Sequence, residues 1–195
     1  MAEERFISID IETDGPIPGD NSMLALGAVA WKNVDGRWGE CASFYQTLEP
    51  LDGAEQDPDT MTWWGDKPEA WAAATKDPQP PGLVTFRFIK WLESQGEKPF
   101  LVAWPVAFDI MWVRWYCYHF QAFNLHPYVS IDMRSVAMGI LGCRADEVVR
   151  KAPAEWAMTG HDSGEEHNHI AEDDAREQAI FFANMLEWGR ARRGF

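Results

Sequence analysis

The sequence predicts an α/β protein in which helices flank a single sheet that begins as an antiparallel meander. Three apolar segments joined by short links lie within residues 6–48, an arrangement typical of sequential antiparallel strands. From residue 59 onward, segments with a helical period alternate with short apolar strands. Because strands come first and then alternate with helices, we expect one mixed sheet covered by helices.

The composition is that of one folded domain, which we place at residues 1–195. Hydrophobic residues make up 46% of the chain and aromatic residues 13%, enough for a substantial core. The charged N-terminus does not resemble a signal peptide, and no apolar stretch is long enough to span a bilayer, so no membrane partner is expected. Three widely spaced cysteines (Cys41, Cys117 and Cys143) indicate reduced thiols, as in a cytoplasmic protein.

The formal net charge of −14 excludes one class of function, a protein that holds nucleic acid through a broad basic surface. Neutralising many phosphates requires many lysine and arginine side chains. An enzyme that grips a few nucleotides through bound divalent ions is compatible with this charge, because the ions supply the positive charge themselves.

The first strand begins at Phe6 and ends at Gly15, where Pro16 and Pro18 prevent it from continuing. Two further strands and the hairpin turn between them are predicted at residues 23–31, 38–48 and 33–36.

Helices are predicted over residues 59–64, 68–74, 83–95, 108–120, 133–141 and 171–188, with short strands at 100–104 and 128–131. The C-terminal helix is the clearest, because its apolar residues recur every three or four positions, at Ala171, Ala175, Ala179, Phe182 and Leu186. Residues 144–168 are expected to be irregular.

Asp10 and Glu12 are the first candidate site residues. In a strand, the period of two places both carboxylates on one face, and Ile9 and Ile11 on the other. Neighbouring carboxylates repel each other, so this pair indicates either a cation site or a surface strand that carries two acids.

Two more acids and a histidine follow later in the chain. Asp109 comes directly after an apolar strand, where it is either a ligand at the edge of the sheet or an acid that satisfies helix amides. Asp174 lies on the flank of the apolar stripe of the C-terminal helix, whereas Glu172 and Asp173 are expected at the surface. His169, five residues before Asp174, is either a general base or a solvated side chain.

These residues resemble the three motifs of the DEDDh group of 3′–5′ exonucleases. Residues 10–15 (DIETDG) resemble its Asp-x-Glu-Thr-x-Gly motif, residues 102–109 resemble the strand-to-helix turn closed by Phe-Asp, and residues 169–175 (HIAEDDA) resemble its His-x-Ala-x-x-Asp-Ala motif. The motifs occur in order over nearly the whole chain. The resemblance implies a ribonuclease-H-like fold, with a mixed sheet that is antiparallel over the first three strands and parallel afterwards.

The resemblance also implies a catalytic site. Asp10, Glu12, Asp109 and Asp174 would bind two Mg²⁺ or Mn²⁺ ions, which prefer such oxygen ligands, and His169 would deprotonate the attacking water. The implied reaction releases nucleoside 5′-monophosphates from the 3′ end of RNA or DNA. A homodimer is left open.

The resemblance further implies substrate contacts just after Glu12, within the first motif. Thr13, Asp14 and Gly15 are the candidates for holding the terminal nucleotide, and Trp64 is either a stacking platform for a base or a core residue. The segment TMTWW at residues 60–64 resembles a Trp-Trp-bearing subgroup that includes a mycobacterial exoribonuclease and phage exonucleases, which slightly favours RNA.

Other features qualify this assignment. Trp104 and Pro105 occupy the positions where the second motif usually carries His-Asn, which removes a polar contact near the substrate. Asp132 lies where many members of the resembled group carry an aspartate, and it is expected either to support the metal ligands or to stabilise the fold. Arg150 or Lys151 would contact an upstream phosphate, unless both are simply solvated.

Two other classes of function remain open for this chain. One is a metal-dependent phosphoesterase that acts on small nucleotides, which the acidic surface permits. The other is a non-catalytic nucleic-acid-binding module of the same fold, against which the complete set of four acids and a histidine argues.

Overall fold

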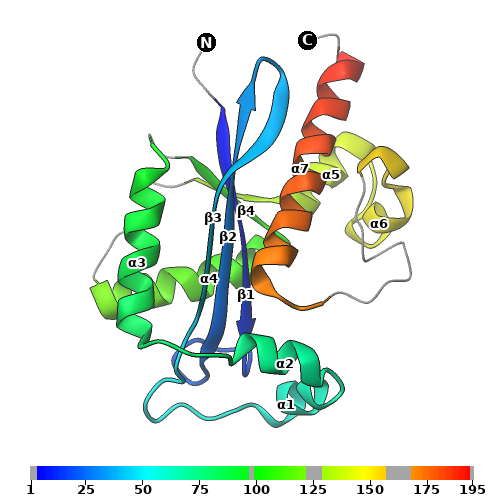
Figure 1. Ribbon diagram of the computed structural model, residues 1–195. Coiled ribbons are helices and arrows are strands. Elements are labelled where there is room, and N and C mark those ends of the chain that lie inside the picture. The colour runs from blue at the N-terminus through cyan, green and yellow to red at the C-terminus, as the bar shows by residue number, and fades with distance from the viewer. Residues whose placement is uncertain (1–3, 97–98, 122–128, 157–167, 194–195) are drawn as a thin grey trace.

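A five-stranded mixed sheet with the strand order β3-β2-β1-β4-β5 forms the centre of the molecule (Figure 1). The computed structural model describes residues 4–96, 99–121, 129–156 and 168–193. The strands are β1 (Arg5–Thr13), β2 (Met23–Val34), β3 (Arg37–Thr47), β4 (Phe100–Ala103) and β5 (Ser130–Asp132). The first three pair antiparallel, and β4 is parallel to both β1 and β5, which confirms the predicted mixed sheet.

The hairpin between β2 and β3 is tighter than the predicted turn at residues 33–36. Its two central residues, Asp35 and Gly36, have φ values of 51° and 85°. Positive φ at both positions defines a type I′ turn, whose twist matches that of the flanking strands. Asn33 and Val34 can therefore pair with Trp38 and Arg37 and extend the ladder.

The helices are α1 (Pro58–Gly65), α2 (Pro68–Ala74), α3 (Pro81–Ser94), α4 (Val106–Tyr116), α5 (Met133–Leu141), α6 (Val148–Lys151) and α7 (Ala171–Arg193). The helix predicted over 108–120 starts two residues earlier and ends in a π-helical turn, Cys117–Gln121. Part of the segment expected to be irregular is helical, with α6 between two 3₁₀ turns, Ala145–Glu147 and Ala154–Trp156.

Helix α7 extends five residues beyond the predicted end at Trp188. Trp188 packs edge-on against Trp156, and the guanidinium of Arg192 lies 3.7 Å from the centre of the Trp188 ring. Arg190 forms an ion pair of 2.6 Å with Glu4 at the start of β1. These tertiary contacts hold the last turn of the helix, where the apolar period alone gives no signal.

Two apolar cores lie on opposite faces of the sheet. Ile7, Ile9 and Ile11 of β1 point toward α3 and α4, whereas Phe6 packs against Phe182 of α7 on the other face. Burial of one such aliphatic side chain contributes about 1.5–3 kcal/mol. Because of the alternation along β1, Asp10 and Glu12 face α7, as the period of two predicts.

A smaller apolar cluster holds α1 and α2 beneath the end of the sheet (Figure 1). Trp64 of α1 and Ala70 of α2 pack with Ala171, the first residue of α7. The start of α7, the carboxyl end of β1 and the helix pair α1–α2 therefore meet in one region. None of the described helices is long and apolar enough to cross a membrane.

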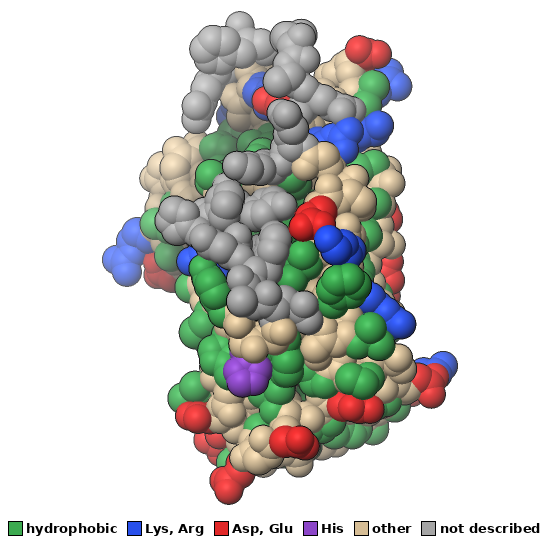
Figure 2. All heavy atoms as spheres, turned by 90° about the vertical axis from the view of Figure 1, so that its left-hand side faces the viewer, with side chains coloured by type: hydrophobic (Ala, Val, Ile, Leu, Met, Phe, Trp, Pro, Cys, Tyr) green, Lys and Arg blue, Asp and Glu red, His purple; other side chains and the backbone are tan. Residues whose placement is uncertain are grey.

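The face that carries α3 shows no broad basic surface in its described part (Figure 2). Lysine and arginine side chains stand apart from one another there, among apolar and acidic ones.

Candidate active site

Asp10 and Glu12 lie at the carboxyl end of β1, in the centre of the sheet. Asp10 pairs with Gly27 of β2, and Glu12 is 8% exposed. The side-chain amide of Gln178, from α7, donates a hydrogen bond of 2.8 Å to Oδ1 of Asp10. The carboxylates therefore point into the space between the sheet and α7.

Gly27 allows α7 to approach the sheet this closely. A Cβ atom at Gly27 would overlap the backbone of Ala171 and Glu172, in the first turn of α7. A glycine inside a strand often marks such a close backbone approach. The contact places the first turn of α7, with Asp174, next to Glu12.

A methyl group at Gly27 should therefore displace α7. We expect Gly27→Ala to destabilise the protein by about 1–3 kcal/mol, the range for overpacking, and to lower any catalytic rate at least tenfold. Thermal denaturation and initial rates measure both effects. Gly39→Ala in β3 is the control, because its Cβ would meet no atom within 4 Å. Equal behaviour of the two variants would contradict this role of Gly27.

Asp109 reaches the same region from α4. Its carboxylate is 3% exposed and lies in the first turn of α4, while Pro105 at the N-cap provides no capping side chain. Burial raises the pKa of Asp109 to about 7, although backbone hydrogen bonds from Asp109 itself and Ile11 act in the opposite direction. The hydrogen bond to Ile11 links the carboxylate directly to β1.

The four carboxylates interact electrostatically. The pKa of Asp10 is raised well above its ordinary value, mainly by burial and then by Asp109, Glu12 and Asp174. The pKa of Glu12 is raised by burial first, then by Asp174 and Asp109. Because Asp109 and Asp174 raise the pKa of both Asp10 and Glu12, the four acids lie close enough to act as one set of oxygen donors, which fits hard divalent cations such as Mg²⁺.

His169 lies beside two of these acids. One ligand atom each from Glu12, His169 and Asp174 lies within 4.8 Å of the others. The imidazole contacts the ring of Trp63 edge-on, with 4.8 Å between the ring centres. His161 and His167, the alternatives in the sequence, lie outside the described residues.

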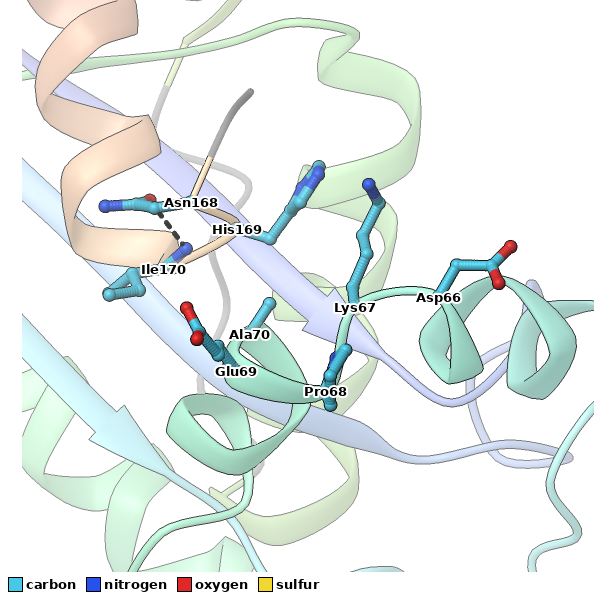
Figure 3. Close-up of a pocket in the computed structure, with 8 residues that line it drawn as sticks. All are labelled: Asp66, Lys67, Pro68, Glu69, Ala70, Asn168, His169 and Ile170. Carbon is cyan, nitrogen blue, oxygen red and sulfur yellow. Dashed lines mark hydrogen bonds between the residues drawn. The ribbon is translucent and has the colours of Figure 1, made fainter. Parts of the chain in front are cut away.

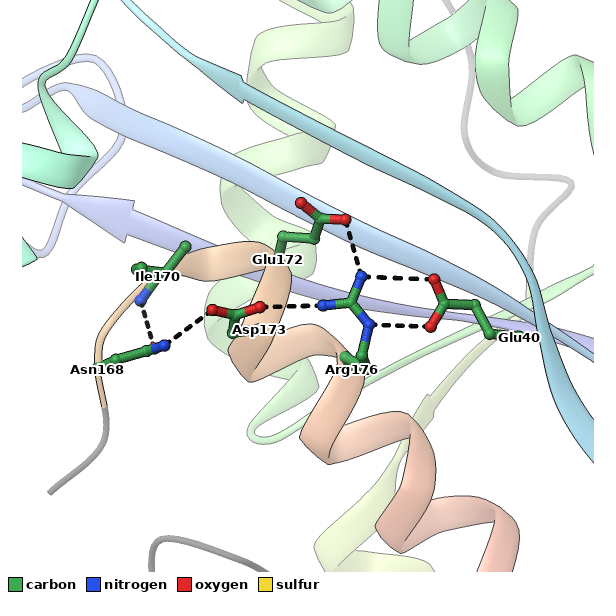
Figure 4. A network of polar contacts seen from close by, with 6 residues as sticks. All are labelled: Glu40, Asn168, Ile170, Glu172, Asp173 and Arg176. Atoms are coloured by element: carbon green, nitrogen blue, oxygen red, sulfur yellow. Dashed lines mark hydrogen bonds and ion pairs between the residues drawn. The ribbon is translucent and has the colours of Figure 1, made fainter. Parts of the chain in front are cut away.

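The backbone at His169 is held in a left-handed conformation, with φ of 51°. Asn168 supports it from both sides: its Oδ1 accepts from the amide of Ile170 at 3.0 Å, and its Nδ2 donates to Asp173 at 2.8 Å (Figure 4). This bracket fixes the direction in which the imidazole leaves the chain.

Arg176 forms ion pairs with two of the three consecutive acids at the start of α7, Glu172 and Asp173 (Figure 4). Its guanidinium pairs with Glu172 at 2.8 Å, with Asp173 at 3.0 Å and with Glu40 of β3 at 2.9 Å. Glu172 is thus turned toward Arg176, Asp173 is held between Arg176 and Asn168, and Asp174 faces the site.

Thr13, Asp14 and Gly15 form a tight bend after β1. The Thr13 hydroxyl donates to the carbonyl of Gly15 at 2.8 Å, and the Asp14 carboxylate, 1% exposed, accepts from the amide of Ser22. A Cβ at Gly15 would overlap the side chain of Asn21. Asp14 therefore holds the bend, while Thr13 and Gly15 border open space.

That space is a groove of about 470 Å³, within the usual size range of ligand pockets. Residues from β1, the bend, α1 and α4 line it, among them Glu12, Thr13, Gly15, Trp63 and Phe108.

Trp64 occupies the core position, one of the two alternatives for this residue. It is 2% exposed, and its indole N–H donates to the carbonyl of Thr13 at 2.9 Å. Its neighbour Trp63 is 40% exposed and offers an accessible ring at the groove. A hydrogen bond for the buried indole favours this placement of Trp64.

Asp132 and Trp104 hold neighbouring elements of the fold together. Asp132 caps α5 through Ser135 at 2.8 Å and accepts from the amide of Val106 at 3.1 Å, so it joins the starts of α4 and α5. The Trp104 ring packs edge-on against Phe181 of α7 and contacts the guanidinium of Arg134.

Sequence reasoning missed four residues of this region. Gln178 follows Asp174 by one helical turn, a spacing that could have identified it. Gly27 interrupts an otherwise apolar strand, which is also a visible signal. Trp63 stands in the TMTWW segment, but which of its two tryptophans faces the groove depends on how α1 and α2 pack, as does the position of Lys67.

The sheet order and the carboxylates at its end define an α/β nuclease fold of the ribonuclease-H-like, DEDDh type. The chain belongs to the Rv2179c-like 3′–5′ exoribonuclease domain family, whose model matches residues 5–186. Members of this class are hydrolases. The sequence is 27% identical over 189 residues to the 3′–5′ DNA exonuclease Cap18 of Escherichia coli, covering 92% of this chain and 90% of Cap18.

Solved structures show the same fold. The nuclease domain of 3′hExo, a DEDDh family member bound to rAMP, matches with a TM-score of 0.64 and 13% identity, over 96% of this chain and 94% of that domain. Cell-death related nuclease 4 (CRN-4) matches with a TM-score of 0.64 and 17% identity, over 95% of this chain. The chain spans 64% of the length of CRN-4.

Proposed function

We propose that this chain is a metal-dependent 3′–5′ exonuclease that releases nucleoside 5′-monophosphates from RNA or DNA with a free 3′ end. The observation that carries the proposal is the convergence of four acids and a histidine at the carboxyl end of β1. Membership of the exoribonuclease family supports the same reaction.

Asp10, Glu12, Asp109 and Asp174 would hold two Mg²⁺ or Mn²⁺ ions. When bound, such ions stabilise the charge on the attacking and leaving oxygens of a phosphodiester. His169 accepts the proton of the attacking water, since its ring lies beside Glu12 and Asp174. The Asn168 bracket keeps that ring in place during the proton transfer.

The terminal nucleotide would occupy the groove beside the acids. Thr13 and Gly15 border it, Asp14 holds the bend that carries them, and Trp63 takes over the stacking role considered for Trp64. The family is described as exoribonucleases, while Cap18 is named a DNA exonuclease. We retain the slight preference for RNA.

We further propose that the exonuclease unit is a single domain over residues 1–195 and works in the cytoplasm. The three cysteines are free thiols, which suits a reducing compartment. A homodimer is open to test by light scattering.

RNA and DNA oligonucleotides labelled at either end test the proposed reaction, in Mg²⁺, in Mn²⁺ and in EDTA. We expect a label at the 3′ end to appear at once in mononucleotides, and strands labelled at the 5′ end to shorten stepwise. In EDTA we expect no reaction. Cleavage of free nucleotides alone would indicate a small-molecule phosphoesterase. Binding of the oligonucleotides without cleavage would indicate a non-catalytic module.

The raised pKa of Asp109 predicts a pH dependence for the metal-free protein. An acid whose pKa is about 7 in the folded state, against ~3.9 unfolded, stabilises the fold below the unfolded value and loses that contribution as the pH rises through 7. We expect the melting temperature in EDTA to fall from pH 5 to pH 7.5. Asp109→Asn should flatten this slope, whereas Asp20→Asn, which removes an exposed charge, should not. Equal slopes in all three proteins would contradict the assignment.

A further inference from the structure

Most arginine side chains near α7, and both basic residues of α6, are already paired with acids. Arg150 and Lys151, the sequence candidates for a phosphate contact, both pair with Glu147, at 3.2 and 3.0 Å. Helix α6 also lies beside α5, away from the carboxyl end of β1 (Figure 1). A substrate that starts at the four acids therefore needs another cation.

Lys67, in the link between α1 and α2, is placed to supply it. Its ammonium group lies 5.2 Å from the centre of the Trp63 ring, the same ring that His169 contacts. The lysine and His169 line one hollow of about 480 Å³. Both side chains extend in the same direction into it, whereas the Asp66 carboxylate points away (Figure 3).

Within the described part of the chain, the Lys67 side chain forms no ion pair. It precedes α2 at the N-cap position but makes no capping hydrogen bond there. Contact with an aromatic face holds an ammonium group without neutralising its charge. Lys67 is thus a positioned, uncompensated cation in a protein of net charge −14.

We propose that Lys67 binds the substrate phosphate that follows the scissile one toward the 5′ end. This inference rests on the proposed exonuclease function. The groove lined by Glu12, Thr13 and Phe108 would take the terminal nucleotide, and the scissile phosphate would lie over the acids. Trp63 lines this groove, and its ring contacts Lys67 and His169, which line the hollow, so the strand would enter the hollow next.

Trp63 connects phosphate binding by Lys67 with proton transfer by His169. Its ring supports the ammonium group of Lys67 and the imidazole of His169 together. A phosphate seated on Lys67 therefore aligns the strand with the proton acceptor. Lys67 acts as a positioning residue, and its removal should weaken substrate binding more than the chemical step.

The first test compares Lys67→Ala with Lys67→Arg and Lys76→Ala. Lys76 is an exposed lysine beyond the other end of α2, so its removal changes the net charge equally. For release of the first nucleotide from a single-stranded oligonucleotide, Lys67→Ala should raise KM about tenfold, the effect of one hydrogen bond to a charged group. We expect kcat to change less than twofold, and Lys67→Arg to restore most of the binding.

The second test locates the phosphate. The linkage next to the scissile one is replaced by an uncharged methylphosphonate, and release of the first nucleotide is measured. The wild type should lose about tenfold in kcat/KM, and Lys67→Ala should lose nothing further. A full additional loss in Lys67→Ala, or equal effects of Lys67→Ala and Lys76→Ala, would overturn the proposal. Absence of mononucleotide release by the wild type on the unmodified strand would instead refute the exonuclease function itself.

Discussion

Asp174→Asn is expected to lower the exonuclease rate at least about 10³-fold, corresponding to about 4 kcal/mol of transition-state stabilisation. Asp174 raises the pKa of both Asp10 and Glu12, so its carboxylate lies close enough to share a metal site with them. Removing it takes one oxygen ligand from a shared site. Single-turnover assays in Mg²⁺ measure the loss, and calorimetric Mg²⁺ titration should show weaker binding.

The same substitution should leave folding intact. In the absence of metal, neutralising one of four mutually repelling carboxylates should raise the melting temperature slightly. Glu172→Gln is the matched control, because Glu172 lies in the same turn of α7 and pairs with Arg176 instead of facing the site. We expect it to change the rate less than threefold. An active Asp174→Asn variant, or an inactive Glu172→Gln variant, would show that the register of α7 at the site is different.

His169→Asn is expected to lower kcat by 10²- to 10⁴-fold, the usual contribution of a general base. Asparagine is the informative replacement, since it tolerates the left-handed backbone at this position better than alanine. The fold should therefore survive while the proton acceptor is lost. The wild-type rate should rise over the range in which histidine ordinarily titrates, about pH 6–7, and the variant should lose this rise.

His119→Asn is the control for this prediction. His119 stacks on Trp115 in the π-helical turn after α4, with 4.4 Å between the ring centres. Its replacement should leave both the rate and its pH dependence unchanged. If His169→Asn kept the wild-type pH profile at a reduced rate, the titrating group would be another residue, and His169 would serve only to hold the site together.

Much of the fold was predictable because local patterns carried it. The alternation along β1, the Asp35-Gly36 turn and the prolines at the starts of α1 and α2 are signals of a few residues each. The end of α7 was not predictable, since Trp156 and Glu4, distant in sequence, support its last turns. Short helical turns such as α6 lack the length that makes a periodic pattern visible.

For the site, local patterns were enough to predict the chemical types and their order: paired acids near the end of a strand, an acid opening a helix, and a histidine five residues before the last acid. Which of these side chains lie close together depends on the packing of distant segments. That packing placed Trp64 in the core and Trp63 at the groove, directed Glu172 and Asp173 to Arg176, and brought Lys67 beside His169. The physical reason is that burial, desolvation and ion pairing depend on neighbours contributed by distant segments. Local spacing determines the face of an element on which a residue lies, and the packing of elements determines what that face meets.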